Sequence, residues 1–373
     1  MKVLSVVGAR PNFVKIAPLL REMAGRPQLQ SVLVHTGQHY DARMSDGFFE
    51  ALAIPAPDFN LAVGSGSHAR QTAEVMTRLE PVLESVRPDV VLVVGDVNST
   101  LAAALVAVKQ GIRVGHVEAG LRSFDRSMPE EINRLATDAI SDDLFASEES
   151  AVSNLAREGV PAERVHFVGN VMIDALRLTR PLWEASRVFA DLGLDRIRRY
   201  GTVTLHRPAN VDDPRRLRQI LGALHEVARH VPLIFPVHPR VRERLMGADV
   251  TWLGAAQPVP ERGIVCTDAL GYLDFVALVS RAAVVLTDSG GIQEETTILG
   301  VPCLTLRENT ERPVTVTHGT NRVIGVARSR IIDAALFALA HPPAKPAAPP
   351  LWDGYASARI VDTLLGAAVE VAA

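Results

Sequence analysis

The chain has 373 residues, of which 47% are hydrophobic and 22% charged, and its formal net charge is −3; this length favours two domains, and the charge argues against nucleic acid or an anionic membrane as the main partner. No stretch approaches the ~20 apolar residues that cross a bilayer, so we expect no membrane partner. The isolated cysteines Cys266 and Cys303 suit a reducing compartment, and we expect a cytoplasmic protein.

Short β-branched runs alternate with longer amphipathic stretches in the first half. The predicted strands are Lys2–Val7, Ser31–His35, Asp89–Val94, Arg113–Val117, Leu144–Ala146 and Arg164–Val168. The predicted helices include Phe13–Met23, His68–Val86, Ser99–Gln110 and Glu130–Ile140. A continuous run such as Val90–Val94 is typical of a strand buried on both faces, which indicates a parallel sheet covered by helices.

The same alternation restarts in the second half, with predicted strands at Thr202–Leu205, Leu233–Val237, Gly263–Cys266, Ala283–Thr287 and Pro302–Leu306. The charged stretch Arg177–Arg199 is expected to carry the crossover, and the final helical pattern is expected to return to the first half. We therefore predict an α/β fold of two doubly wound Rossmann-like domains that face a central cleft. One domain covers residues 1–170 and about 355–373, and the other covers 171–354.

Ligands of doubly wound folds bind beyond the carboxyl ends of the strands, so polar residues that follow the predicted strands are the candidates for a site. After the first strand, Arg10 opens a strand-to-helix turn, and Lys15 follows five residues later. Such a turn can present N–H groups and two cations to a diphosphate, or it can simply carry two solvated cations.

Carboxylates follow two strands of the first half. Asp96 follows the Val90–Val94 run; it can cap the next helix, as can Asn98 or Ser99, but we favour an acid/base role in the crevice. Glu118 lies beside small residues, where partial burial would raise its pKa and suit it to proton transfer, unless it pairs with Arg122.

The segment Met128–Arg134 is typical of a helix start. Pro129 takes the first position, and the helix dipole favours Glu130 and Glu131 in the first turn. Glu130 and Arg134 are four residues apart and share a face, while Glu131 points about 100° away. Only one of the two glutamates can therefore address a pocket, and we predict that it is Glu130.

Two histidines, His206 and His238, follow predicted strands of the second half beside prolines, where ordinary loop residues also occur. Neither has a metal-ligand spacing to a second His or Cys, so we predict no metal site. Residues 64–69 match the dinucleotide spacing GxGxxG/A without a buried strand before them. We interpret them as a loop capped by Ser67, and we expect no nicotinamide cofactor.

The strongest single segment runs from Asp288 to Glu295. A predicted strand enters the turn Ser289-Gly290-Gly291, which opens a helix. The glycines would let a phosphate approach the helix N-terminus, and Ser289 adds a hydroxyl donor. Glu295 is expected to accept hydrogen bonds from ribose hydroxyls, and Arg312 adds a cation downstream. An ordinary capped helix is the alternative.

Taken in order, these segments resemble the non-hydrolysing UDP-N-acetylglucosamine 2-epimerases, whose fold is that of GT-B glycosyltransferases; they include GARPNFVKIAPL, VVGDVNSTLA, GHVEAGLRSFDRSMPEEINR, LHRPANVDD and LTDSGGIQEETTILGVPCLTLRENTERP. The resemblance implies UDP contacts for Arg10, Lys15, His206, Ser289, Gly290, Gly291, Glu295 and Arg312, with Phe275 near the uracil. It implies acid/base roles for Asp96, Glu118 and Glu130, supported by Arg134. From their strand-end positions we add His206 to the catalytic set and His238 to the substrate-binding set.

The resemblance also implies a mechanism. UDP leaves C1 while the proton at C2 is removed, which gives a 2-acetamidoglucal, and UDP adds back after reprotonation on the opposite face. A UDP-sugar is then the partner, no cofactor is needed, and a homodimer is implied.

Several alternatives stay open. Some family members are activated by a second UDP-N-acetylglucosamine through residues that match Gln38 and Arg70, whereas the family's second glutamine is Asp41 here. The segments GQHYD and SFDRSMPEEINR also resemble relatives that invert UDP-2,3-diacetamido-glucuronic acid. A hydrolysing 2-epimerase, a GT-B glycosyltransferase and a non-catalytic nucleotide-sugar sensor are further alternatives, and the presence of the carboxylates disfavours the last two.

Overall fold

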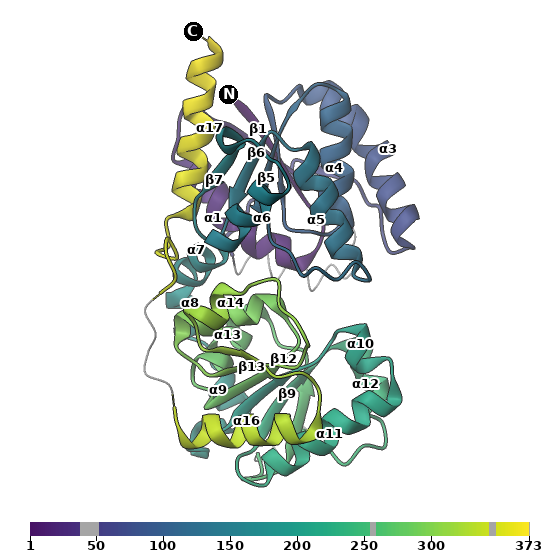
Figure 1. Ribbon diagram of the computed structural model, residues 1–373, viewed down its shortest axis with the longest axis vertical. Helices are drawn as coiled ribbons and strands as arrows, with labels where there is room; N and C mark the ends of the chain where they lie inside the picture. Colours follow the sequence, from purple (N-terminus) through teal and green to yellow (C-terminus); the bar gives the residue numbers. More distant parts are fainter. Residues whose placement is uncertain (38–51, 254–258, 343–347, 373) are drawn as a thin grey trace. The chain divides into compact units, whose positions relative to one another are not determined.

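The computed structural model describes residues 1–37, 52–253, 259–342 and 348–372, which form two compact units. The first unit comprises Met1–Thr179 and Pro350–Ala373, and the second comprises Arg180–Pro349. Each unit is built on a seven-stranded sheet of parallel strands with helices on both faces (Figure 1). The predicted α/β class with two doubly wound sheets is confirmed.

The sheet of the first unit has the strand order β3-β2-β1-β4-β5-β6-β7. Its strands are β1 (Lys2–Val7), β2 (Gln30–His35), β3 (Phe59–Asn60), β4 (Val90–Val94), β5 (Arg113–Ala119), β6 (Asp143–Ala146) and β7 (Val165–Phe167). All five residues of β4 are buried, as its valine-rich run predicts. The order reverses between β1 and β4, so the carboxyl ends of these two strands flank the switch point at which doubly wound folds bind ligands.

Helices cover both faces of this sheet. They are α1 (Arg10–Ala24), α3 (His68–Val86), α4 (Asn98–Lys109), α5 (Pro129–Ile140), α6 (Glu149–Arg157), α7 (Val171–Leu178) and α17 (Ala356–Ala372). Alternate residues of β1, β2 and β4 form a core with α3 and α4, and α17 lies on the opposite side of the sheet (Figure 1). The carboxylate of Asp174 in α7 accepts the N–H groups of Ala356 (3.2 Å) and Ser357 (2.6 Å), which anchors the start of α17.

The sheet of the second unit also has seven strands, with the order β10-β11-β9-β8-β12-β13-β14. Its strands are β8 (Gly201–Thr204), β9 (Leu233–Val237), β10 (Thr251–Trp252), β11 (Ile264–Asp268), β12 (Val284–Thr287), β13 (Cys303–Thr305) and β14 (Asn321–Val323). Here the order reverses between β8 and β12. The second switch point therefore lies beyond these two strands.

The helices of the second unit are α8 (Arg180–Glu184), α9 (Val188–Asp191), α10 (Pro208–Val211), α11 (Pro214–Ala228), α12 (Pro239–Arg242), α13 (Tyr272–Ser280), α14 (Gly290–Leu299), α15 (Val314–Thr317) and α16 (Arg328–Ala340). Residues that alternate along β9 divide between two cores. Leu233 and Phe235 pack with α11 and α16, whereas Ile234 packs with α13 and α14. Figure 1 shows these two helix pairs on opposite faces of the sheet.

Three of the observed strands are not predicted from the sequence, and helix α4 lacks the side-chain cap that the sequence suggests. Strands β3, β10 and β14 have two or three residues at or near the sheet edges, which is too short for a periodic pattern. Helix α4 is preceded by Val97 as its N-cap, and no side chain caps it. The alternative in which Asp96 caps this helix is therefore wrong, and neither Asn98 nor Ser99 caps it.

Candidate active site

Glu118 in β5 lies at the switch point of the first unit and pairs with a lysine. Lys15 in α1 donates a hydrogen bond from Nζ to Oε2 of Glu118, and both side chains are buried. The φ angle of Glu118 is 72°, in the left-handed region, which costs an L-residue about 1–3 kcal/mol and is typical of functional sites. The alternative in which Glu118 pairs with Arg122 is wrong, because Arg122 binds Asp138 (2.7 Å) and Glu158 (2.7 Å).

Gly95, directly after β4, leaves room for this ion pair. Its φ is also 72°, and a Cβ atom here would lie 3.2 Å from Nζ of Lys15 and 3.5 Å from Oε2 of Glu118. A side chain at this position would therefore crowd the pair as well as strain the backbone.

Asp96, the next residue, has an ion-pair partner and remains partly accessible. Its Oδ2 accepts hydrogen bonds from Nη2 (2.8 Å) and Nε (3.2 Å) of Arg134 in α5. The side chain of Asp96 is 27% exposed, whereas that of Arg134 is 3% exposed. A carboxylate held by a buried guanidinium and open to solvent can exchange protons with a bound substrate.

The two glutamates at the start of α5 have different surroundings. Glu131 is 1% exposed, and it binds Arg134 and the N–H groups of Ser123 and Phe124. Glu130 is half-buried, and none of the described residues forms a hydrogen bond or ion pair with its side chain. Arg134 thus pairs with Glu131 and not with Glu130, although Glu130 was expected to share its face.

Two buried residues that the sequence analysis does not select join the ends of β4 and β5. His116 binds Asp138 through Nδ1 (2.6 Å) and the carbonyl oxygen of Gly95 through Nε2 (2.8 Å). The other oxygen of Asp138 accepts the N–H of Gly120 (3.0 Å). Burial alone would raise the pKa of Asp138, but His116, Arg122 and Gly120 outweigh it and hold the pKa below its ordinary value. This network fixes the loops on either side of Glu118.

His206 lies at the switch point of the second unit, and Asp288 holds it. Asp288 follows β12, is fully buried, and accepts a hydrogen bond from Nδ1 of His206 at 3.0 Å. It also accepts the N–H groups of His206 (3.1 Å) and Arg207 (3.0 Å) and the amide of Asn210 (3.1 Å). Burial would raise the pKa of Asp288, but His206, Arg207 and Asn210 hold it below its ordinary value. Since Nδ1 is engaged, Nε2 of this half-exposed histidine is left for a ligand.

The N-terminus of α14 adjoins this pair. Ser289 is its N-cap residue, but its hydroxyl makes no capping hydrogen bond. The alternative of an ordinary capped helix therefore does not describe Ser289. A Cβ atom at Gly290 would lie 2.8 Å from Oε1 of Glu311, so a larger residue would require the buried side chains of Glu311 and Arg312 to shift. A helix N-terminus with free N–H groups and an uncommitted hydroxyl can bind a phosphate.

Buried ion pairs lie behind this helix start. Arg312 binds Glu294 (2.6 Å) and Glu311 (2.7 Å). Burial would raise the pKa of Glu311, but Arg312, Arg307 and Arg207 hold it well below its ordinary value. Glu295 is also buried; its burial and the nearby Glu294 raise its pKa to about 8, against a hydrogen bond from Tyr272.

The remaining predicted residues occupy varied positions. Phe275 in α13 is half-buried against the core, His238 is exposed after β9, and Gly291 lies in the first turn of α14. Arg70 is exposed in the first turn of α3, where its N–H binds the N-cap Ser67 at 3.3 Å, which confirms the predicted cap. Gln38 and the side chain of Arg10 lie outside the described residues.

No group of three or more His, Cys, Asp or Glu within the described ranges is arranged to hold a metal ion. None of the helices described is long and apolar enough to cross a membrane.

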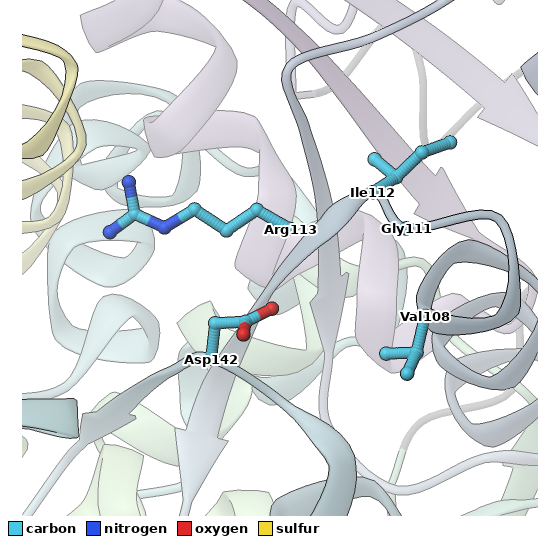
Figure 2. A pocket seen from close by; sticks show the side chains of 5 residues that line it. All are labelled: Val108, Gly111, Ile112, Arg113 and Asp142. Atoms are coloured by element: carbon cyan, nitrogen blue, oxygen red, sulfur yellow. The ribbon is translucent and has the colours of Figure 1, made fainter. Parts of the chain in front are cut away.

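A pocket of about 370 Å³ lies in the first unit, away from the switch point of that unit. Figure 2 shows its lining side chains, which are Val108, Gly111, Ile112, Arg113 and Asp142. These residues precede or begin β5 and β6, so the pocket is at the amino ends of these strands. Ligands of this fold bind at the opposite edge of the sheet.

Comparison with known proteins connects this geometry to one family. Residues 21–365 match the family model described as UDP-N-acetylglucosamine 2-epimerase. A UDP-N-acetylglucosamine 2-epimerase of Methanocaldococcus jannaschii is 42% identical over 340 residues, which cover 90% of this chain and 91% of that protein. A UDP-2,3-diacetamido-2,3-dideoxy-D-glucuronate 2-epimerase of Pseudomonas aeruginosa is also 42% identical, over 342 residues that cover 91% and 92%.

Solved structures agree with these relatives. The crystal structure of the M. jannaschii enzyme in complex with UDP-GlcNAc and UDP has a TM-score of 0.88 and 40% identity, and the match covers 98% of this chain and 99% of that one. The two-domain α/β fold is thus GT-B-like, as in the known 2-epimerase structures. The chain belongs to the UDP-N-acetylglucosamine 2-epimerase family and is a UDP-sugar 2-epimerase, an isomerase.

Proposed function

We propose that the protein interconverts UDP-N-acetylglucosamine and UDP-N-acetylmannosamine without net hydrolysis. The observation that carries this proposal is the pair of carboxylates Asp96 and Glu118 at one switch point, each bound to a buried cation. Inversion at C2 requires one group to remove a proton from one face and another to return a proton to the other face. Glu130, half-buried and unbound among the described residues, is a third candidate for this work.

The reaction proceeds by anti elimination and re-addition. The bond from C1 to the diphosphate oxygen breaks, and its electron pair leaves with UDP. A carboxylate of the first unit takes the proton from C2, and the electrons of that bond form the C1–C2 double bond of 2-acetamidoglucal. Protonation of C2 on the opposite face and return of UDP to C1 complete the inversion. Atoms and charge balance without an external redox partner.

The second unit supplies the groups for the departing diphosphate. The N-terminus of α14, the hydroxyl of Ser289 and the ring of His206 are the donors available there. Such donors stabilise negative charge that develops on the leaving group. Phe275 and Glu295 are proposed contacts of the uridine, with Arg312, His238, Arg10 and Lys15 as further UDP-sugar contacts. Lys15 binds Glu118 in this structure. Its proposed contact with UDP therefore requires the ammonium group to bind both Glu118 and UDP.

Ion pairing in the first unit favours a neutral sugar. Lys15 and Arg134 are already paired with Glu118, Asp96 and Glu131, so a sugar carboxylate would have to compete with these groups for either cation. A uronate would bring a carboxylate beside these acidic groups, where like charges repel. UDP-N-acetylglucosamine carries no charge on its sugar and meets no such repulsion.

A second candidate substrate has a specific observation in its favour. The P. aeruginosa relative, which is as similar as the M. jannaschii one, is a 2-epimerase of UDP-2,3-diacetamido-2,3-dideoxy-D-glucuronate. We therefore propose this uronate as the alternative.

Turnover of the two substrates decides between the candidates. Purified protein is incubated with each UDP-sugar, and products are identified by proton NMR from the C1–C2 coupling of the sugar. We expect UDP-N-acetylmannosamine as the product from UDP-N-acetylglucosamine. The kcat/KM for this substrate should be at least about tenfold above that for the uronate, because a tenfold ratio corresponds to about one charge contact. A higher value for the uronate would reassign the substrate, and free N-acetylmannosamine with UDP would indicate a hydrolysing enzyme.

Three accompanying expectations stay proposals. A homodimer follows from the resemblance, and light scattering measures it. Activation by a second UDP-N-acetylglucosamine through Gln38 and Arg70 would appear as a sigmoidal rate curve. We propose a cytoplasmic location because the substrate is a nucleotide sugar, and the two buried, free cysteines are consistent with a reducing compartment.

A further inference from the structure

The carboxylate of Glu131 accepts more hydrogen bonds than its position in the first turn of α5 explains. The helix dipole alone explains an acidic residue at this position of α5. In the structure its side chain is 2% exposed, and both carboxylate oxygens accept hydrogen bonds. One accepts the N–H of Phe124 (2.9 Å), and the other accepts the N–H (3.0 Å) and hydroxyl (2.9 Å) of Ser123.

The carboxylate oxygen of Glu131 that binds Ser123 is also connected to Asp96 through Arg134. It accepts a hydrogen bond from Nη1 of Arg134. The other edge of the same guanidinium, Nη2 and Nε, binds Oδ2 of Asp96 at 2.8 and 3.2 Å. Because a guanidinium is planar and rigid, a carboxylate that fixes one edge also fixes the direction of the other.

The main chain at Asp96 is held by the same helix. Asn133 in α5 donates a hydrogen bond from its amide to the carbonyl oxygen of Asp96 at 2.9 Å. Helix α5 therefore sets the Asp96 backbone through Asn133 and the carboxylate through Arg134. Of the side chains in this chain of contacts, only that of Asp96 is appreciably open to solvent.

We propose that Glu131 is a positioning residue of the epimerase reaction, which holds Arg134 in the orientation that aims Asp96 at C2 of the sugar. The inference rests on the proposed role of Asp96 in proton transfer. Without the Glu131 charge, Arg134 keeps one carboxylate partner and can rotate with it. A displacement of about 1 Å at a reacting group can lower a rate by about 10²-fold.

Glu131 also anchors the loop after β5, and the test must separate the two roles. Glu131→Gln removes the charge that holds Arg134. Ser123→Ala is the matched control, because it removes a hydrogen bond to the same oxygen without touching Arg134. The inhibition constant of UDP reports binding, which the second unit supplies, and thermal unfolding reports the fold.

We expect kcat of Glu131→Gln to fall about 10²-fold, while KM and the UDP inhibition constant stay within about threefold of the wild type. Ser123→Ala should keep kcat within about threefold. If Glu131 acts through Arg134, the double variant Glu131→Gln/Arg134→Met should be no slower than Arg134→Met alone, because the two losses lie on one path.

Three results would overturn the proposal: a wild-type kcat in Glu131→Gln, additive losses in the double variant, or an equal loss in Ser123→Ala. Should Glu131→Gln not fold, Arg134→Lys asks the same question, since one ammonium cannot bridge both carboxylates as the guanidinium does. The same loss of kcat with unchanged UDP binding is then expected, and a wild-type kcat contradicts the proposal. A wild-type protein without epimerase activity would contradict the proposed function itself, and this is seen before any variant is made.

Discussion

Near the switch point of each unit a buried aspartate binds a histidine, and these two pairs differ in exposure. In the first unit, Asp138 binds His116, whose side chain is 0% exposed and uses both ring nitrogens within the protein. In the second unit, Asp288 binds Nδ1 of His206, whose side chain is 43% exposed and whose Nε2 binds none of the described residues. The same pairing therefore serves the fold in one unit and leaves a nitrogen for chemistry in the other.

We propose that the two switch points divide the reaction in the same way. That of the first unit is rich in carboxylates, which can move protons, and that of the second has a helix N-terminus, a hydroxyl and a histidine, which suit a diphosphate. Two seven-stranded parallel sheets can thus support different chemistry, because the residues that follow their strands differ.

The largest expected effect comes from the pair of the second unit, in which His206 is partly exposed. His206→Asn should lower kcat by about 10²–10⁴-fold, because it removes a positioned proton donor or acceptor. Its midpoint of thermal unfolding should change little, since the ring is half exposed. Steady-state kinetics and a melting curve measure both quantities, and a variant that loses stability but keeps kcat would reverse the assignment of the two pairs.

Removing the buried pair should cost stability instead. Asp138→Asn leaves His116 and Arg122 without their shared carboxylate, and loss of one partner of a buried pair costs about 3–5 kcal/mol. Because the folded pKa of Asp138 is lowered, its contribution is present above the unfolded value and is lost as pH falls through the folded one. Urea unfolding at pH 7 and near pH 3 should show the deficit shrinking in acid. The exposed Glu163→Gln serves as control, and an unchanged deficit in acid would contradict the charged pairing.

A third change concerns the buried carboxyl of α14. The pKa of Glu295 is raised to about 8, so between its unfolded value and pH 8 the unfolded chain releases a proton that the folded chain keeps. The wild type should lose stability relative to Glu295→Gln as pH rises through this window, by at most about 1.4 kcal/mol per pH unit. Melting curves from pH 5 to pH 9 measure the difference, and parallel curves would mean that Glu295 titrates normally.

The smallest expected effect concerns the two N-cap serines, Ser289 and Ser67. Ser289→Ala should weaken UDP binding about tenfold, the loss of one hydrogen bond to a charged group, without loss of stability, because Ser289 makes no capping bond. Ser67→Ala removes a real cap and should cost about 1 kcal/mol of stability without weakening UDP binding. Calorimetry of UDP binding and urea unfolding report both, and equal behaviour of the two variants would contradict a phosphate site at α14.

Local patterns predict much of this arrangement and fail where distant segments meet. The run Val90–Val94 predicts a buried parallel strand, and the Ser-Gly-Gly turn predicts the helix start of α14, because each depends on neighbouring residues. The partners of the carboxylates are not predictable in this way. Lys15 and Glu118 are 103 positions apart, and His206 and Asp288 are 82 apart, so only the folded sheet brings them together.

The central claim is that the protein inverts C2 by proton transfer through its own exchangeable carboxylates. Conversion of UDP-N-acetylglucosamine by the wild type in deuterated water, followed by NMR, tests it most directly. We expect UDP-N-acetylmannosamine with deuterium at C2, because the carboxylates exchange with solvent before they reprotonate the intermediate. A manno product that retains the original hydrogen at C2 would contradict this mechanism.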